Sequence, residues 1–235
     1  GVDQSRINVT INGVPLNDAE SQGVFWVDLP DLGSSMTGLQ IQRGVGTSTN
    51  GPAAFGATVS VNTLGTLAKP GIRAVLGGGS FGTHRRTLAW NTGMLQDGWS
   101  FEGRASRITS DGWVDRATSD LSSLYGRVAK RWETGRLSLT TTLGHERTYQ
   151  AWYGVPVIAL TDSSDEAIRA WAAGSYEYNY ASEESSEYDK NRLEDLIKNR
   201  ERHNYAQYKD EVDDYRQDHF QLHLDQAMGD WNLGG

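Results

Sequence analysis

The chain has 235 residues, no cysteine, 8 Trp and 10 Tyr, and its 30 acidic and 22 basic side chains give a net charge of -8. The absence of cysteine excludes a disulfide framework, a thiolate metal site and a cysteine nucleophile. No run of about 18 to 20 apolar residues is present to form a membrane-spanning helix, whereas a membrane strand needs only about 9 to 11 residues of alternating polarity.

Short strands are predicted in the first quarter of the chain. Residues 7–11 alternate in polarity and lead into Asn12-Gly13, a dipeptide suited to a type I′ hairpin turn because both of its residues take positive φ. Further strands are predicted at residues 39–43 and 58–63, with a glycine-punctuated loop between them. This part of the chain therefore reads as a small β or α/β unit.

After residue 67 the pattern changes to longer strands with a two-residue period. In residues 99–107, apolar or small side chains alternate with Ser, Glu and Arg, which predicts a strand with one polar face. Similar alternation predicts strands at residues 72–80, 86–95, 124–132, 137–150 and 219–228, with another beginning at Trp231. At about 10 residues, these strands are longer than the globular average of about 5 or 6.

The connections between these strands alternate in length. Tight turns are predicted at residues 96–98, 133–135 and 229–230, and longer loops at 110–120 and 151–216. Short turns on one side and long loops on the other are typical of outer-membrane barrels. A soluble antiparallel barrel or sandwich shares the alternation, but it usually has shorter strands and buries its apolar face, and it is the alternative.

The negative charge is concentrated in one segment. Residues 162–218 contain 16 acidic and 8 basic side chains, so the rest of the chain is neutral, and seven of the ten tyrosines lie in the same segment. A neutral body with an acidic insert argues against a nucleic-acid-binding protein, which needs a basic face. The segment is interpreted as a solvated surface loop. Two short helices are predicted within it, one from the capping-box pair Ser163 and Glu166 and one after Ser186, over residues 187–199.

Several motifs in their order along the chain resemble those of TonB-dependent outer-membrane receptors. Residues 11–18 read I-N-G-V-P-L-N-D and are similar to a segment of that family's plug domain, with Asn12 where the family usually has Asp. Ile41-Gln42-Arg43-Gly44 resembles the strand that ends in Arg-Gly, and residues 55–63 resemble the last plug strand. Val45, Asn50 and Ser60 depart from frequent family residues, which bears on the subfamily rather than on the family.

The resemblance implies a mainly β fold in two parts. Residues 1–67 would be the C-terminal part of a small α/β plug domain, and residues 68–235 the first six or seven strands of a transmembrane antiparallel β-barrel, with residues 151–216 as a long extracellular loop. A barrel wide enough to need a plug has about 22 strands. The implied location is the outer membrane of a Gram-negative cell, with the chain's outer face against lipid. The implied energy source is the TonB-ExbB-ExbD complex, whose contact segment precedes the plug in this family.

The resemblance also suggests site residues. Arg43 resembles a plug arginine that pairs with carboxylates of the barrel wall, and Glu102 and Glu146 are the inward-facing candidates within this chain; a partner on strands outside it, or a turn-capping role for Arg43, is the alternative. Candidates for ligand contact are aromatic side chains of the long loop, where amphipathic rings offer apolar area and a polar tip. They are Trp152, Tyr153, Tyr176, Tyr178 and Tyr180. Packing of loop against loop, or anchoring in lipid headgroups, is the alternative for these rings.

The predicted function is active import of a scarce nutrient, most simply a ferric siderophore or another iron complex, without covalent chemistry, cofactor or resident metal site. A SusC-like importer of glycans or peptides is a second hypothesis, and a soluble β-rich carbohydrate-binding or adhesion module is a third. The text match of Gly78-Gly79-Ser80-Phe81-Gly82 to a hydrolase nucleophile motif is discounted because a strand, not a helix, is expected after it. His219 and His223, about 13 Å apart along one strand, are too distant to share a metal ion.

Overall fold

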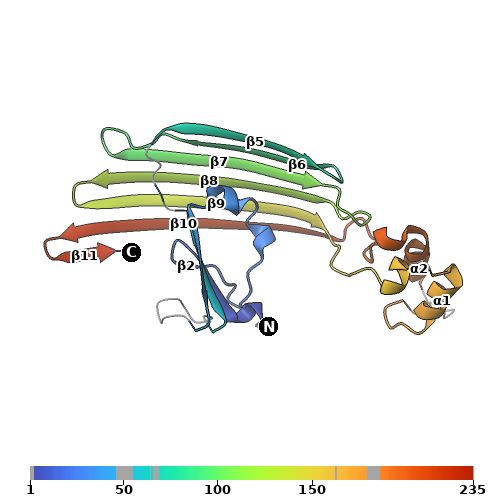
Figure 1. Ribbon diagram of the computed structural model, residues 1–235. Helices are drawn as coiled ribbons and strands as arrows, with labels where there is room; N and C mark the ends of the chain where they lie inside the picture. Colours follow the sequence, from blue (N-terminus) through green and yellow to red (C-terminus); the bar gives the residue numbers. More distant parts are fainter. Residues whose placement is uncertain are drawn as a thin grey trace.

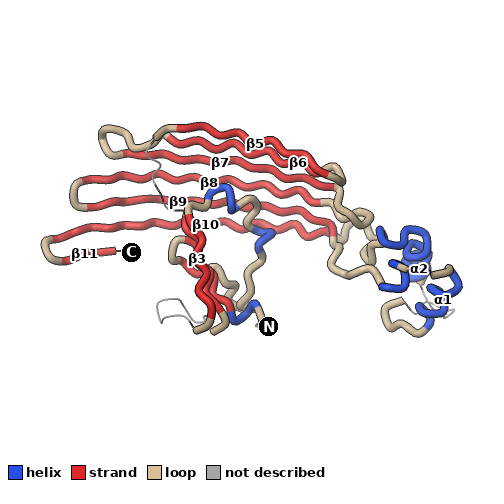
Figure 2. Tube along the Cα trace, in the orientation of Figure 1, coloured by secondary structure: helices blue, strands red, loops and turns tan. Residues whose placement is uncertain are grey.

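The computed structural model describes residues 3–45, 55–63, 65, 69–161, 163–178 and 186–234. Two β-sheets of unequal size dominate it, and the small sheet stands against one face of the large sheet (Figure 1). The two α-helices of the described residues lie beyond one end of the large sheet's strands (Figure 2). In the described part of the chain, no helix is long and apolar enough to cross a membrane.

The small sheet has the strand order β2-β1-β4-β3. Its strands are β1 (Ile7–Ile11), β2 (Val14–Pro15), β3 (Gly38–Arg43) and β4 (Ala57–Asn62), and only the β1 and β4 pair is parallel. Asn12 and Gly13 have φ values of 54° and 84°, so the predicted hairpin turn is confirmed. The sheet and its loops, residues 3–63, are called the inner unit below, and their core consists of Ile11, Leu29, Leu32 and Val61.

Short 3-10 helices connect the strands of the inner unit. They are η1 (Gln4–Arg6), η2 (Trp26–Asp28) and η3 (Leu32–Ser35). The η2 helix lies against two strands of the large sheet, β9 and β10. The segment between β2 and β3 therefore supplies part of the contact between the two sheets.

The large sheet is an antiparallel meander in chain order, from β5 at one edge to β11 at the other. Its strands are β5 (Gly71–Gly79), β6 (Thr83–Asn91), β7 (Trp99–Ser110), β8 (Ser119–Trp132), β9 (Gly135–Tyr149), β10 (Val212–Met228) and β11 (Trp231–Gly234). The seven strands predicted after residue 67 are all present. The sheet is open at both edges within this chain, in the form of a partial barrel wall.

Several strand boundaries differ from the prediction by a few residues; β8, for example, begins at Ser119 rather than at residue 124. β10 begins at Val212, inside the predicted loop 151–216, because the polar residues at its start pair with β9. Asp214 lies opposite Arg147, and Arg216 lies opposite His145. Sequence alternation does not predict a strand in a segment whose residues are nearly all polar, as at this end of β10. β6 ends at Asn91 rather than at residue 95, because the chain leaves the ladder after its last pairing, with Glu102.

The large sheet has an inverted polarity. The face turned away from the inner unit carries exposed apolar side chains, including Leu88, Leu124, Leu139, Phe220 and Leu222. The face turned toward the inner unit carries buried polar side chains: Ser100, Arg104, Ser106, Ser123, Arg127, Thr140, Thr142 and Glu146. A soluble sheet packs its apolar face inside and leaves the polar face in water. Here the arrangement is reversed.

The long connection between β9 and β10 folds on itself. It contains η5 (Val157–Leu160), α1 (Asp165–Ala173), α2 (Glu187–Asn199) and η6 (Arg200–Arg202). The range of α2 matches the prediction, and Ser186 caps it by accepting from the backbone N–H of Asp189. Ser164, not Ser163, caps α1, because its hydroxyl is the one that accepts from Ala167. The helices pack around Ile168, Ala172, Tyr178 and Leu196, so the loop has a hydrophobic core of its own.

Candidate functional site

Asp31 makes the densest contact between the inner unit and the large sheet. It precedes η3 and adopts a left-handed conformation with φ of 54°, which Asp tolerates better than most residues. Its carboxylate accepts from the Arg85 guanidinium at 2.7 Å and lies 3.3 Å from that of Arg104. Thr87 and Ser106 donate hydroxyl hydrogen bonds to it, and Arg104 also donates to the Asp31 carbonyl at 2.7 Å. One residue of the inner unit thus binds to both β6 and β7.

This ion pair is largely removed from water. The side chains of Asp31 and Arg104 are 6% and 2% exposed, whereas that of Arg85 is 41% exposed. Burial by itself raises the pKa of Asp31, but hydrogen bonds from Ser106, Ser34 and Thr87 and the charge of Arg104 outweigh it, so the pKa lies below its ordinary value. Asp31 is therefore ionised when it is seated against the sheet.

A second contact joins the hairpin turn of the inner unit to β10. The Asn12 side-chain amide donates to Gln221 at 2.9 Å and to the Thr63 hydroxyl at 2.8 Å, and its oxygen accepts from the Thr63 backbone N–H. Gln221 donates in return to the carbonyl of Ile11 at 3.1 Å. The Tyr125 hydroxyl of β8 donates to the Thr63 carbonyl. Because all of these groups are buried, the network fixes the position of the inner unit along the strands.

A third contact depends on a glycine. A Cβ atom on Gly144 would lie 2.1 Å from the carbonyl oxygen of Asp28, so β9 lets the inner-unit backbone approach only because this position lacks a side chain. Next to it, the Ser123 hydroxyl donates to the Pro30 carbonyl at 2.6 Å. Residues 28–31 therefore lie directly on the polar face of β7, β8 and β9.

Beside these contacts lies an open hollow of about 770 Å³ between the inner unit and the ends of β9 and β10. Five acidic residues are among its lining residues: Asp18, Asp28, Glu146, Asp213 and Asp214. Phe25, Val27, Trp152 and Tyr215 supply apolar surface, and the lining contains no Lys or Arg. Burial raises the pKa of Asp28, which lies in the inner unit. A ligand here would meet aromatic surface and negative charge together.

The structure does not bring the three predicted latch residues together. Arg43 is exposed at the end of β3, and among the described residues it makes no ion pair. The Glu102 carboxylate lies 3.5 Å from Arg127 of the neighbouring strand, and Glu146 accepts from the Thr148 hydroxyl. Pairing of Arg43 with the barrel wall therefore stays a prediction, and the ion pairs that join the two sheets here are those of Asp31.

The predicted ligand-contact aromatics fall into three groups. Trp152 is 74% exposed and lines the hollow, and its contact with a ligand stays a prediction. The ring of Tyr153 packs against that of Tyr205 with centroids 4.4 Å apart and the ring planes tilted by 35°. Tyr176 is fully exposed and is not among the residues that line the hollow. Tyr178 requires a correction, because it is 2% exposed in the loop core and is explained by loop packing rather than by ligand contact. Tyr180 lies outside the described residues.

The buried end of Tyr178 belongs to a polar chain that organises the loop. Its hydroxyl lies 3.1 Å from His203 Nε2, and His203 Nδ1 lies 2.6 Å from the Asp195 carboxylate. Burial alone raises the pKa of Asp195, but the hydrogen bond and charge of His203, with Arg116 nearby, outweigh it and lower the pKa below its ordinary value. Arg116 belongs to the connection between β7 and β8, so this chain of contacts also ties the two loops together.

Sequence reasoning missed Asp31 and Gly144. Asp31 lies in a loop, and its partners on β6 and β7 follow 54 to 75 residues later, so no local spacing links them. Arg104 did show a usable signal, since it lies on the polar face predicted for residues 99–107. No group of three or more His, Asp or Glu residues close enough to hold a metal ion is found in the described ranges.

The fold matches solved outer-membrane receptors. The ferric-catecholate import receptor Fiu from E. coli K12, in its open form, superposes with a TM-score of 0.67 at 17% identity, over 98% of this chain and 30% of that chain. The chain has the fold of one part of an import receptor. FpvA from P. aeruginosa, bound to a heterologous pyoverdine, gives a TM-score of 0.60 at 12% identity, over 95% of this chain and 26% of that chain.

A third solved structure, the siderophore receptor PiuA from Acinetobacter baumannii, gives a TM-score of 0.54 at 12% identity over 72% of this chain. The chain spans less than a third of the length of these receptors. No protein-family model and no curated protein matches the sequence. At these identities the match establishes the fold alone.

Proposed function

We propose that this chain is part of a TonB-dependent outer-membrane receptor that imports a scarce nutrient, with its apolar face against lipid. The observation that carries the proposal is the inverted polarity of the large sheet. Leu88, Leu124 and Phe220 are exposed, while Arg104, Ser123 and Thr142 are buried against the inner unit. Exposed apolar strands of 9 to 17 residues are costly in water and favourable in a bilayer.

The inner unit supports a gated importer rather than an open pore. It is held on the lumen side by a buried ion pair, a buried amide network and a close backbone contact, all of which can be broken without breaking a covalent bond. In this proposal, energy passed from TonB-ExbB-ExbD displaces or remodels the inner unit so that ligand enters the periplasm. No covalent chemistry is required of any residue.

The proposed ligand is an iron complex, the class named for the structural neighbours Fiu and FpvA. The hollow between the inner unit and β9 and β10 is its first contact within this chain, with Trp152 as the exposed aromatic wall. Because Asp18, Asp28 and Asp213 line the same hollow without a basic residue, this part of the site favours a neutral or cationic complex over a strongly anionic one.

The test uses the complete receptor in a strain that lacks it. Growth under iron limitation is measured with single iron sources of different net charge, with and without TonB. Rescue that requires both the receptor and TonB, and that is stronger with a neutral ferric complex than with an anionic ferric catecholate, supports the proposal. Equal growth with and without the receptor on every iron source would contradict it.

The other two hypotheses make distinct predictions in the same experiments. A SusC-like importer would restore growth on an oligosaccharide or peptide as the limiting nutrient rather than on iron. A soluble adhesion or carbohydrate-binding module would purify as a folded monomer without detergent. The exposed apolar face of the large sheet argues against the latter, because it would aggregate in water.

Arg43 remains part of the proposal as a plug residue whose partner lies on barrel strands beyond this chain. Its exposure at the end of β3 leaves the guanidinium free to meet such a partner. Arg43→Ala in the complete receptor is expected to weaken plug retention. Unchanged uptake and unchanged protease protection of the inner unit would remove this residue from the latch.

A further inference from the structure

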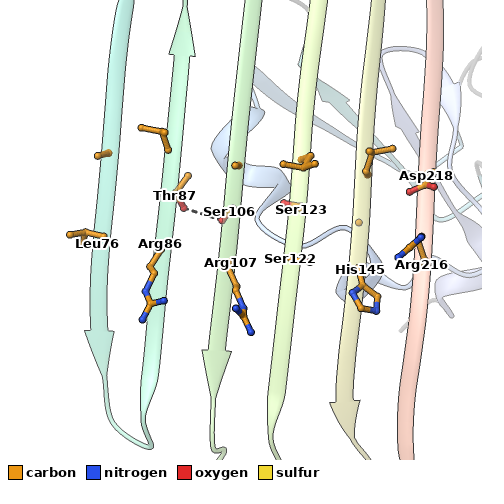
Figure 3. A pocket seen from close by; sticks show the side chains of 16 residues that line it. Leu76, Arg86, Thr87, Ser106, Arg107, Ser122, Ser123, His145, Arg216 and Asp218 are labelled. Atoms are coloured by element: carbon orange, nitrogen blue, oxygen red, sulfur yellow. Dashed lines mark hydrogen bonds between the residues drawn. The ribbon is translucent and has the colours of Figure 1, made fainter.

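A row of basic side chains crosses the outward face of the large sheet. The strand registers place Arg86 of β6 opposite Arg107 of β7, Arg107 opposite Ser122 of β8, Ser122 opposite His145 of β9, and His145 opposite Arg216 of β10. Residues directly opposite one another share a face of the sheet. Figure 3 shows these side chains side by side across adjacent strands. They are called the basic row below.

The basic row consists of two pairs with different local partners. Arg107 is held by Asp120 through two hydrogen bonds of 2.9 and 2.6 Å, and His145 lies 2.8 Å from Asp214. Arg86 and Arg216 are exposed, and in the part of the chain that the structure describes they make no ion pair. In the pair Arg86 and Arg107, and in the pair His145 and Arg216, one basic side chain has a carboxylate partner and the other has no ion-pair partner among the described residues.

The basic row borders an apolar band on the side away from the loops. The next cross-strand row toward the tight turns contains Leu88, Ala105, Leu124 and Leu143. Together with Leu76 these residues line a shallow hollow of about 710 Å³ on the outer face. Asp218, at the edge of this hollow, is the one acidic residue in its lining.

The basic row lies at the depth in the membrane at which lipid headgroups are found. Arg107 lies eight residues from Trp99, which is at the other end of β7. This separation is about 27 Å along the strand, or about 20 Å along the membrane normal for a strand with the usual tilt. The outward apolar band of a barrel is about 25 Å tall. The basic row lies at the margin of this band near the long loops, and Trp99 lies at the opposite margin.

We propose that the basic row and the hollow beneath it bind a phosphorylated glycolipid of the outer leaflet, with the chemistry of lipid A. The inference rests on the outer-membrane location in the proposed function and adds a lipid site that ligand import does not require. The pair Arg86 and Arg107 and the pair His145 and Arg216 are centred three interstrand spacings apart, about 14 Å. A disaccharide headgroup with a phosphate at each end meets one pair with each phosphate, and its acyl chains lie over Leu88 and Leu124.

The charge pattern favours this lipid over other occupants of the face. Zwitterionic phospholipid offers one phosphate compensated by its own amine, whereas the glycolipid offers two uncompensated phosphates for the two unpaired arginines. A second protein copy on this face would need anions opposite Arg86 and Arg216 within an apolar surface. Arginine is suited to phosphate because its planar fork donates two hydrogen bonds in parallel.

The test measures glycolipid that stays with the complete receptor after extraction from the outer membrane and purification in mild detergent. The variant Arg86→Gln/Arg216→Gln is compared with wild type and with Lys130→Gln, a basic residue on the same outward face beside Trp99 at the opposite margin. Native mass spectrometry counts bound lipid A, and titration with lipid A, dephosphorylated lipid A or inorganic phosphate gives the affinities. An exposed arginine near an anionic lipid surface changes affinity about fivefold, so the double variant should bind lipid A roughly 30-fold more weakly.

The inference is supported if the double variant loses lipid A while Lys130→Gln stays within about twofold of wild type and dephosphorylated lipid A binds weakly to all three. It is overturned if the double variant retains lipid A as well as wild type, if removal of the phosphates makes no difference, or if inorganic phosphate alone occupies the site equally well. Cross-linking that places a second receptor copy on this face also overturns it. Cell fractionation and iron-dependent growth are measured in the same strains. A receptor found outside the outer membrane defeats the proposed function and this inference together, whereas normal uptake with unchanged lipid content defeats the inference alone.

Discussion

Replacement of Asp31 by Asn in the complete receptor tests whether one carboxylate seats the inner unit. Asn has the same shape and also tolerates the left-handed backbone at this position, so the change removes charge without new strain. Removing one partner of a buried ion pair costs about 3 to 5 kcal/mol, because the other charge is left without compensation. Arg104, 2% exposed, is that other charge. Arg85, 41% exposed, adds at most about 1 kcal/mol because water screens it.

This free energy corresponds to a shift of about 10² to 10⁴ in the equilibrium between the seated and released inner unit, at about 1.4 kcal/mol per tenfold. Hydrogen exchange of the amides around η3, residues 32–35, reports the shift in the detergent-solubilised receptor. Arg85→Gln is the matched control, because it removes the exposed partner of the same carboxylate. Its exchange should rise less than about tenfold.

Acidification should mimic the substitution. The folded pKa of Asp31 is lowered, so its stabilisation is fully present above the ordinary carboxyl pKa of about 4 and disappears as the pH falls through the folded value. Exchange of wild type at low pH should therefore approach that of Asp31→Asn. The reasoning is refuted if Asp31→Asn exchanges within about threefold of wild type at neutral pH, or if Arg85→Gln has an equal effect.

Three further predictions concern the other contacts. Gly144→Ala places a Cβ 2.1 Å from the Asp28 carbonyl and should destabilise the seated inner unit by about 1 to 3 kcal/mol in the same exchange assay, whereas Gly77→Ala, with 3.6 Å to its nearest atom, should have little effect. A double-mutant cycle of Asn12→Ala and Gln221→Ala should give a coupling free energy of about 1 kcal/mol in thermal unfolding, and strict additivity would show that the buried amide pair is unimportant. Asp195→Asn should speed proteolysis of the loop between β9 and β10 by replacing the charged acceptor beside buried His203 with a neutral amide, while the neighbouring Glu194→Gln, whose partner Arg169 is exposed, should leave the rate nearly unchanged.

The strands of this chain were predictable because each residue of the large sheet meets one of two environments. Residues 99–107 alternate cleanly since one face of β7 is exposed and apolar and the other is buried against the polar contacts of the inner unit. The range 7–11 of β1 and the range 187–199 of α2 were predicted to the residue, because an Asn-Gly turn and a serine cap mark their ends. The first residues of β10 were not predicted as strand, because Asp213, Asp214 and Arg216 do not alternate with apolar residues.

The contacts of the candidate site were much less predictable. The polar faces of β7 and β9 were identified, and Glu102 and Glu146 lie on them, but Glu102 pairs with Arg127 of the neighbouring strand and Glu146 accepts from Thr148 of its own strand. Asp31 and Arg104 meet across 73 residues of chain, and Gly144 is significant only because the Asp28 carbonyl lies against it. Local patterns determine which face a residue occupies, whereas the pairing across two sheets is a tertiary property.

The composition of residues 162–218 does not show which of their acidic side chains form ion pairs within the loop and which line the hollow. Within the loop, four acidic side chains form ion pairs, so much of the acidic character serves to fold the loop. The pairs are Asp165 with Arg200, Asp189 with Arg192, Glu194 with Arg169, and Asp195 with His203. The acidic lining of the hollow has a different origin, because Asp18, Asp28 and Glu146 lie outside that segment and only Asp213 and Asp214 come from it. The charge that an incoming ligand meets is thus set mainly by the inner unit and β9, in the part of the chain whose summed charge is zero. Substitution of Asp18 and Asp28 should therefore change ligand charge preference more than neutralising acids within the loop helices.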